Sequence, residues 1–392
     1  MNYNETIDYI FQKLPMFSRM GSAAFKKDLT NIRILCEHLG NPQEKFKSIH
    51  IAGTNGKGST SHMLAAIFQT AGYKTGLYTS PHLYDFRERI KLNGDMVPEE
   101  FIVRFVNDLR PLIEEIEPSF FEITVAMAFQ FFAEQKVDIA VIEVGLGGRL
   151  DSTNIITPEL SIITNIGWDH MNILGNSLEE IAVEKAGIIK PNVPVVIGET
   201  LPETKKIFQE IVADRQAPVY WAEECFSIEA IHTNPASLSV EYRKKDHTPV
   251  FIECDLPGIY QAQNIRTVLT AVSVLHRTGW TLGEQVVAKA LKSVKQLTGL
   301  GGRWEVIQQK PTIVLEVAHN ENGIRQMMAH LRQLTYDHLH LIIGVVKDKD
   351  VEKVLSLLPT DATYYFTQAA IPRALPATEL KRQAEHLHLS GD

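Results

Sequence analysis

A glycine-rich stretch near residue 50 combines residue types that can hold a phosphate group. It follows an apolar run at 48–53, and a helical pattern begins directly after it. Backbone amides at such a strand-to-helix turn, together with the helix dipole, can converge on phosphate oxygens, and a lysine adds a positive charge. The residues expected to contact a nucleotide phosphate are Thr54, Asn55, Gly56, Lys57, Gly58 and Ser59. This context favours a nucleotide-binding loop over a flexible glycine turn.

One position departs from the general phosphate-loop pattern. A serine or threonine normally follows the lysine and holds magnesium, but Gly58 stands there, and Ile51 replaces the first glycine. The metal must therefore find other oxygens. The first candidate is Ser80, because a neighbouring parallel strand ending at 74–80 would bring its hydroxyl beside the loop. The alternative is that this Ser-Pro pair only ends a strand.

Two more side chains close predicted strands with groups that can serve a metal. Glu143 lies on a continuous apolar strand, where a buried carboxylate is costly unless a cation balances it. A structural salt bridge is the alternative for this residue. His170 ends a later strand, but a histidine there is more often a packing residue, and magnesium prefers oxygen ligands.

The elements that must position these residues follow an alternating strand-and-helix pattern. Continuous apolar runs predict buried strands at 48–53, 74–80, 137–145, 159–166 and 193–199. Helical spacing between Ser59 and Gly72 predicts the helix after the loop. We therefore expect a largely parallel α/β sheet with its ligands at the carboxyl ends of the strands.

The remaining chain predicts an added antiparallel part and a second domain. Shorter polar strands at 225–254 indicate an antiparallel extension of the sheet, and a helix at 264–278 closes the first domain. Glycines at 299–302 mark a domain joint, so we expect domains at 1–295 and 296–392. Strands at 312–318, 339–346 and 362–368 build the smaller, Rossmann-like α/β domain.

Composition narrows the class of protein. The chain has 392 residues with 44% hydrophobic residues, enough for two cores. A net charge of -8 argues against a nucleic-acid or anionic-membrane surface. Three separated cysteines suggest neither disulfides nor zinc, and the start has no signal-peptide pattern. We expect a cytoplasmic monomer that binds small molecules, without nucleic-acid or membrane partners.

Five ordered motifs then resemble a known family. GTNGKGS, TSPHL, EVGLGGRLDSTN, NIGWDHM and EKAGIIK are similar to the folylpolyglutamate synthase and dihydrofolate synthase family of the Mur ligase superfamily, over about residues 17–380. The resemblance implies an ATP-dependent ligase. A carboxylate of 7,8-dihydropteroate or of a reduced folate takes the γ-phosphate, and the L-glutamate amine displaces it from the acyl phosphate. One such enzyme can add glutamate to both acceptors, 7,8-dihydropteroate and a reduced folate.

The resemblance also implies a pair of Mg²⁺ ions served by Ser80, Glu143 and His170. Lys185 matches a lysine that family members carbamylate, which turns an ammonium into an oxygen ligand for the second metal. From the residues alone, Ser177 and Glu180 predict a capping box, with Lys185 on the last helical turn before Gly187. A solvated lysine at a helix end is the alternative.

Further site residues follow from the same resemblance. For ATP these are Asn264, Arg303 in a GGR that replaces the family's PGR, and Glu316 and His319 in EVAHN, where a glutamate replaces the usual aspartate. The segment GVVKDKD at 344–350 also matches. For the pterin substrate they are Phe121, Glu122, Leu150, Asp151 and Ser152. Arg89 follows TSPHL and is expected to meet a substrate carboxylate. Core packing is the alternative for Phe121, and an exposed arginine without a specific partner is the alternative for Arg89.

Other functions remain open at this point. The chain also fits another Mur-type amino-acid ligase, a P-loop kinase or NTPase, or a folate-binding protein without catalysis. It stops at HLSGD, where family members continue, so the sequence predicts a shortened second domain with an exposed sheet edge.

Overall fold

The computed structural model divides the chain into two compact units. The first comprises Met1–Leu14 and Lys27–Glu316, and the second Pro15–Lys26 and Val317–Asp392. The structure describes residues 1–16, 21, 28–244, 247–347 and 350–391. Phe17, where the family resemblance begins, and Asp348 and Lys349 of GVVKDKD lie outside the described residues. The division falls after Glu316, whereas the expected boundary at 295–296 stays a prediction.

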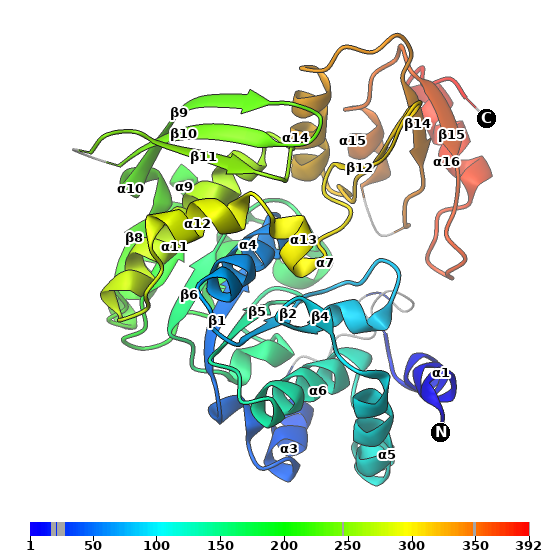
Figure 1. The fold of residues 1–392 in the computed structure, drawn as a ribbon. Helices are drawn as coiled ribbons and strands as arrows, with labels where there is room; N and C mark the ends of the chain where they lie inside the picture. The colour runs from blue at the N-terminus through cyan, green and yellow to red at the C-terminus, as the bar shows by residue number, and fades with distance from the viewer. Residues whose placement is uncertain (17–20, 22–27, 245–246, 348–349, 392) are drawn as a thin grey trace. The chain divides into compact units, whose positions relative to one another are not determined.

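A large sheet forms the frame of the first unit (Figure 1), in the order β4-β3-β2-β5-β1-β6-β7-β8. Its strands are β1 (Lys47–Ala52), β2 (Thr75–Tyr78), β3 (Ile90–Leu92), β4 (Asp95–Met96), β5 (Ile139–Glu143), β6 (Leu160–Ile163), β7 (Val195–Ile197) and β8 (Val219–Trp221). Strands β2, β5, β1, β6, β7 and β8 pair in parallel, and β3 and β4 add an antiparallel edge. The predicted parallel sheet is confirmed.

Helices cover both faces of this sheet because its central strands are apolar on both sides. On one face, Ile49, Ile51 and Val141 pack against α4 (Lys57–Thr70) and α11 (Gln261–Arg277). On the other, Ile163 and Ile197 pack with α8 (Leu178–Ala186) and α9 (Pro202–Asp214). The strand ends are thereby left as the accessible edge, in agreement with the predicted location of the site.

Further helices of the first unit complete its layers. They are α1 (Tyr3–Lys13), α3 (Thr30–His38), α5 (Glu99–Ile116), α6 (Phe120–Glu134), α7 (Met171–Leu174), α10 (Ala222–Cys225), α12 (Glu284–Leu291) and α13 (Val294–Thr298). Short 3-10 turns are η2 (Pro42–Glu44), η3 (Phe86–Arg89) and η4 (Ser152–Ile155). Among the described residues, no helix is both long and apolar enough to span a membrane.

Two sequence expectations about strand pairing were wrong. The segment 225–254 forms a separate three-stranded antiparallel sheet, β9 (Phe226–Thr233), β10 (Leu238–Lys244) and β11 (Val250–Cys254), rather than an extension of the large sheet. Its buried residues Leu238, Val240 and Tyr242 pack against α11. The small sheet is therefore held to the rest of the first unit through one apolar face. The strand expected at 312–318 is β13 (Thr312–Leu315), which pairs in an antiparallel hairpin with β12 (Glu305–Gln309) within the first unit.

The second unit is a small α/β arrangement, as predicted. Strands β14 (His340–Ile343) and β15 (Thr363–Phe366) pair in parallel, and Tyr364 also forms a parallel bridge with Gly391. Its helices are α14 (Glu321–Leu331), α15 (Val351–Leu355) and α16 (Ala377–His386). Side chains such as Leu355, Tyr364 and Leu380 are buried and form its core.

Phe132 tests the packing of α6 on the sheet. Its ring is fully buried, and a β-carbon at Gly76 of β2 would lie 2.8 Å from it, so the ring rests directly on the strand backbone. Phe132→Ala should destabilise the protein by about 3–5 kcal/mol through lost burial and the remaining cavity. Thermal unfolding followed by circular dichroism measures this. Phe251→Ala, at a phenylalanine 61% exposed, is the control and should leave the unfolding temperature nearly unchanged.

Candidate active site

The glycine loop lies between β1 and α4 and is held by the end of β6. The Asn165 carbonyl accepts from the Thr54 amide at 3.0 Å, and its side-chain oxygen accepts from the Asn55 amide at 2.9 Å. Gly53 and Gly56 have φ of 149° and 81°. A β-carbon at Gly53 would lie 1.8 Å from the Thr164 hydroxyl oxygen, so the loop can pass this close only with glycine.

Two lysines share one main-chain acceptor within this loop. The Nζ of Lys57 donates to the Gly53 carbonyl at 3.0 Å and to the Thr54 carbonyl at 3.1 Å. The Nζ of Lys185, which lies on the last turn of α8 as predicted, donates to the same Gly53 carbonyl at 2.9 Å. Elements far apart in sequence thereby bring two ammonium groups to the phosphate loop.

The local cap of α8 differs in part from the predicted capping box. The Ser177 hydroxyl accepts from the Glu180 amide at 3.1 Å, as expected. The Glu180 carboxylate instead accepts from the Asn176 amide at 2.6 Å, one residue earlier than the box requires. The helix still ends at Gly187, so Lys185 keeps its predicted place.

Burial and neighbouring charges shift the pKa values of Lys57 and Lys185. Loss of hydration and, to a smaller extent, the neighbouring Lys57 charge lower the pKa of Lys185 to about 7, while Asp169 and Asp151 oppose the shift. Loss of hydration also lowers the pKa of Lys57, against the attraction of Glu143 and Asp169. At neutral pH a substantial fraction of Lys185 therefore carries an uncharged, nucleophilic amine.

Glu143, Ser80 and Arg303 meet at the place where the loop lacks a side chain. The Ser80 amide donates to a Glu143 oxygen at 3.1 Å. A β-carbon at Gly58 would lie 3.4 Å from an Arg303 nitrogen and 3.9 Å from both Glu143 carboxylate oxygens. Burial raises the pKa of Glu143, and Lys57, the Ser80 amide and Arg303 counter this. Gly58 thus leaves open a space between a carboxylate and a guanidinium.

The donor set at this space suits a hard cation. It offers the buried Glu143 carboxylate and the Ser80 residue of the TSPHL motif, and oxygen donors are the ligands that Mg²⁺ prefers. His170 lies one residue beyond Asp169, half-buried, with its Nε2 3.7 Å from the Asp169 carboxylate. Within the described ranges, no three His, Cys, Asp or Glu side chains gather as a ready metal site. The expected metal-binding set of Ser80, Glu143, His170 and Lys185 is not of this kind, because it includes a serine hydroxyl and a lysine.

The other predicted nucleotide residues of the first unit also lie around the loop. A β-carbon at Gly56 would lie 2.2 Å from the Asn264 amide oxygen, so Asn264 rests on the loop backbone. Asn264 donates to Gln261, whose amide donates to the Ser59 hydroxyl at 3.1 Å. Glu316 accepts from the Tyr260 hydroxyl at 2.6 Å and the Trp304 amide at 3.0 Å, which fixes the backbone beside Arg303. Glu316, the glutamate that replaces the family's aspartate, therefore positions the backbone next to Arg303.

His319 belongs to the second unit and is described within it. It is exposed, and its Nδ1 lies 3.0 Å from the Val317 carbonyl. The next residue, Asn320, caps α14 by accepting from the Gly323 amide at 2.9 Å. A role for His319 toward ATP stays a prediction.

Arg89 is not the exposed arginine that the sequence left as an alternative. It is buried, its Nε donates to the Nδ1 of His82 at 2.8 Å, and its guanidinium carbon lies 5.1 Å from the centre of the Phe120 ring. Since the arginine only donates, His82 accepts through Nδ1, and burial with the Arg89 charge lowers the pKa of His82 to about 4. A buried, paired guanidinium of this kind is suited to meeting a carboxylate.

The residues expected to bind a pterin fall into two groups. Phe121 is half-buried, and a β-carbon at Gly145 would lie 2.4 Å from its ring and 3.2 Å from an Asp151 oxygen, so these residues lie together. Leu150 is half-buried and Ser152 is buried beside them in sequence. Glu122 instead turns back to cap α6, where it accepts from the Ser119 amide and hydroxyl at 2.7 and 2.8 Å.

Both carboxylate oxygens of Asp151 accept hydrogen bonds from backbone amides of the protein. One accepts from the Leu146 amide at 2.8 Å, and the other from the Thr153 amide at 3.0 Å. Burial raises the pKa of its carboxyl, and the bonds from these groups oppose the rise. The carboxylates of Asp151 and Glu122 therefore shape the loops in this structure, and their predicted contacts with a pterin ring stay predictions.

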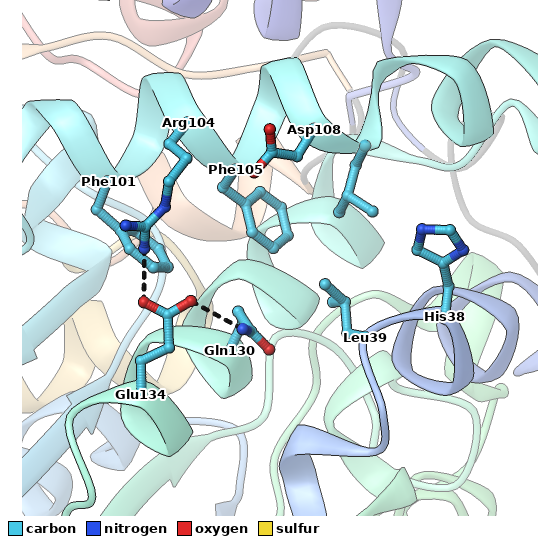
Figure 2. Close-up of a pocket in the computed structure, with 9 residues that line it drawn as sticks. His38, Leu39, Phe101, Arg104, Phe105, Asp108, Gln130 and Glu134 are labelled. Carbon is cyan, nitrogen blue, oxygen red and sulfur yellow. Dashed lines mark hydrogen bonds and ion pairs between the residues drawn. The ribbon is translucent and has the colours of Figure 1, made fainter.

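Sequence reasoning missed several residues of this site. Asp169 raises the pKa of both Lys57 and Lys185, and its place after the strand predicted at 159–166, next to His170, is the signal that could have found it. Tyr260 and Gln261 were missed because their partners Glu316 and Ser59 are distant in sequence, and His82 was missed although its partner Arg89 is only seven residues away. One cavity of about 170 Å³ lies elsewhere, between α3, α5 and α6, and Figure 2 shows its Arg104–Glu134 ion pair. None of its lining residues was predicted to bind a ligand.

A phosphate loop, a carboxylate on the adjacent strand and a second α/β unit are the features expected of an ATP-dependent ligase of the Mur type. The Mur ligase middle domain matches residues 51–272, and the Mur ligase glutamate ligase domain matches residues 302–391. The chain belongs to the dihydrofolate synthase/folylpolyglutamate synthase family of Mur ligases, as the motifs predicted.

Individual relatives agree along most of the chain. The dihydrofolate synthase/folylpolyglutamate synthase of Bacillus subtilis is 35% identical over 369 residues, which cover 92% of this chain and 85% of the relative. The folylpolyglutamate synthase of Lacticaseibacillus casei is 33% identical over 96% of this chain and 88% of the relative.

Solved structures show the same fold. The Mycobacterium tuberculosis folylpolyglutamate synthase, complexed with ADP and AMPPCP, has a TM-score of 0.87 at 29% identity, over 100% of this chain and 89% of that one. An FPGS–AMPPCP–folate complex has a TM-score of 0.84 at 33% identity, over 92% and 88% of the two chains. The predicted two-domain α/β fold of Mur ligase type is confirmed.

Lys57 tests the assignment of the loop. Lys57→Ala removes the charge that the loop carbonyls hold in place, so ATP binding should fall below detection in isothermal titration calorimetry. Lys47→Ala, at an exposed lysine of β1, is the control and should bind ATP as the unchanged protein does. Normal ATP affinity in a folded Lys57→Ala protein would contradict the loop assignment.

Proposed function

We propose that this chain is an ATP-dependent ligase that joins L-glutamate to 7,8-dihydropteroate, to the glutamate tail of reduced folates, or to both. The observation that carries the proposal is the convergence of Lys57, Glu143, Ser80 and Arg303 around the open position at Gly58. The family membership and the folate and nucleotide complexes of the relatives support the same chemistry.

In this proposal the first unit binds the nucleotide and activates the acceptor. Loop amides and Lys57 hold the phosphates, and Arg303 meets the γ-phosphate charge as it moves to the acceptor carboxylate. Arg89 orients that carboxylate, and Phe121 packs against the pterin ring beside Leu150, Asp151 and Ser152. The glutamate amine then attacks the acyl phosphate carbon, the C–N bond forms and phosphate leaves.

Mg²⁺ is the cofactor that the residues present best fit. Ser80 and Glu143 would hold one ion, and His170 and a carbamylated Lys185 a second. Bound there, Mg²⁺ neutralises the charge of the phosphates. The chain's own contribution is to keep a carboxylate buried beside the loop, where Lys57 and the Ser80 amide oppose the rise in its pKa that burial causes.

The acidity of Lys185 supports its carbamylation. With a pKa of about 7, the uncharged amine is available at neutral pH, whereas an ordinary lysine is almost fully protonated. Its nitrogen lone pair attacks the carbon of CO₂, an N–C bond forms, and the displaced proton leaves to water. The product carries a negative charge, which relieves the repulsion from Lys57. Below pH 7 the free amine, and with it carbamylation, declines about tenfold per pH unit.

Phosphate release tests the proposed activity and its alternatives together. The protein should release phosphate only when ATP, L-glutamate and an acceptor are all present, with 7,8-dihydropteroate and tetrahydrofolate tested in parallel. Omitting glutamate is the control. ADP formation that does not depend on glutamate would favour a kinase or NTPase, and activity only with a peptidoglycan precursor would favour another Mur-type ligase.

Lys185→Ala tests the carbamate. Ligase activity should fall by several orders of magnitude, because the second metal loses an oxygen ligand, and short carboxylates such as acetate should restore part of it. Lys206→Ala, at an exposed lysine of α9, is the control and should keep full activity. A folded Lys185→Ala protein that no carboxylate rescues, together with no lysine carbamate signal from ¹³C-bicarbonate in the unchanged protein, would contradict this role.

A further inference from the structure

Two buried basic side chains hold the chain segment that leads to Arg303. Lys91 lies on β3 and His62 on α4, and both are less than 5% exposed. Both contact Thr298, the last residue of α13. Neither residue belongs to the nucleotide loop or to the predicted metal or pterin sites.

Lys91 is held by main-chain oxygens at the end of α13. Its Nζ donates to the Thr298 carbonyl at 2.7 Å and to the Gly299 carbonyl at 3.2 Å. Burial lowers the pKa of its ammonium group, and Glu88 opposes the shift. Carbonyls at the C-terminal end of a helix have no partner within the helix, so a cation is stabilising there. The contact fixes the point at which the chain leaves α13.

His62 adds a second contact on the same residue. Its Nδ1 lies 2.7 Å from the Thr298 hydroxyl oxygen, which also bonds the Val294 carbonyl at 2.6 Å. A carbonyl only accepts and a hydroxyl has one hydrogen, so His62 donates through Nδ1 when both bonds form. Burial holds the pKa of His62 well below its usual value, and the Lys91 and Arg303 charges lower it further. His62 is therefore a neutral, fixed donor.

The same helix that carries His62 begins at the nucleotide loop. α4 starts at Lys57, and its first turn includes Gly58, whose missing side chain leaves room for the Arg303 guanidinium. Four residues, 299–302, separate Thr298 from Arg303, and the Gly302 amide among them donates to Glu305 at 2.7 Å. Anchoring Thr298 to α4 and β3 thus sets the distance between the loop and Arg303.

We propose that Lys91 and His62 are positioning residues that hold Arg303 in register with the nucleotide loop through the carbonyls and hydroxyl at 298–299. This inference rests on the proposed function, because it assigns Arg303 to the γ-phosphate. Lys91 contributes the larger part, since its two bonds fix the backbone itself, whereas His62 bonds a side chain.

The test compares binding of ADP with binding of a non-hydrolysable ATP analogue by calorimetry. Lys91→Met keeps the length of the side chain and removes its donors, and should weaken the analogue about tenfold while ADP binding is unchanged. Thr298→Val, which removes the hydroxyl at nearly constant shape, should give a smaller loss in the same direction. If Lys91→Met does not fold, Thr298→Val alone tests the inference.

A double-mutant cycle separates positioning from general stability. In an Arg303→Ala background, Lys91→Met should weaken the analogue no further, because the residue through which it acts is gone. In the protein that retains Arg303, Lys91→Arg keeps a donor at this position and should retain most of the affinity for the ATP analogue. Lys292→Met, at an exposed lysine paired with Glu253 next to α13, is the matched control and should bind both nucleotides normally.

The outcomes distinguish this inference from the proposed function. Equal losses for ADP and the analogue, or an undiminished effect of Lys91→Met without Arg303, would overturn the positioning role. An unchanged protein that prefers the analogue in an Arg303-dependent way but releases no phosphate with glutamate would overturn the ligase reaction and leave the positioning role standing. A protein that binds neither nucleotide would overturn both.

Discussion

The Gly53 carbonyl is the acceptor on which the site depends, because it takes hydrogen bonds from two lysines that would otherwise repel each other without compensation. Lys57 reaches it from the start of α4 and Lys185 from the end of α8. Burial lowers the pKa of both ammonium groups, and the charge of Lys57 also lowers the pKa of Lys185. One backbone oxygen therefore brings the side chains of Lys57 and Lys185 together at the phosphate loop.

The sheet makes this arrangement possible. β1 lies between β5 and β6, so its loop is flanked by Glu143 at the end of β5 and by Asn165 after β6. Neighbouring parallel strands bring their carboxyl ends to one edge, and each contributes one group. The amides of Thr54 and Asn55 are both satisfied by Asn165, which keeps the loop rigid while its glycines leave the backbone accessible.

At Gly58 the site lacks the serine or threonine hydroxyl that normally follows the loop lysine and holds magnesium. Any side chain there would face the Glu143 carboxylate and the Arg303 guanidinium. Its absence leaves the space to groups from three other segments, including Ser80 from the end of β2. Arg303 in turn depends on Glu316, whose carboxylate holds the Trp304 amide, and on the contacts at Thr298. The specificity of the site thus comes from distant segments rather than from the loop motif alone.

The sequence by itself determined the elements and the local chemistry, because these depend on near neighbours. Apolar runs identified β1, β2, β5, β6 and β7, and the loop motif with its departures identified Lys57, Ser80, Glu143 and Lys185 as a group. Only the tertiary structure decided contacts between distant residues. Arg89 is buried against His82 and Phe120, Glu122 and Asp151 bond their own loops, and β13 pairs with β12 in the first unit. A short, half-exposed strand such as β13 can pair with several partners, and a charged side chain is buried only where a distant segment compensates it, so neither outcome is encoded in local spacing.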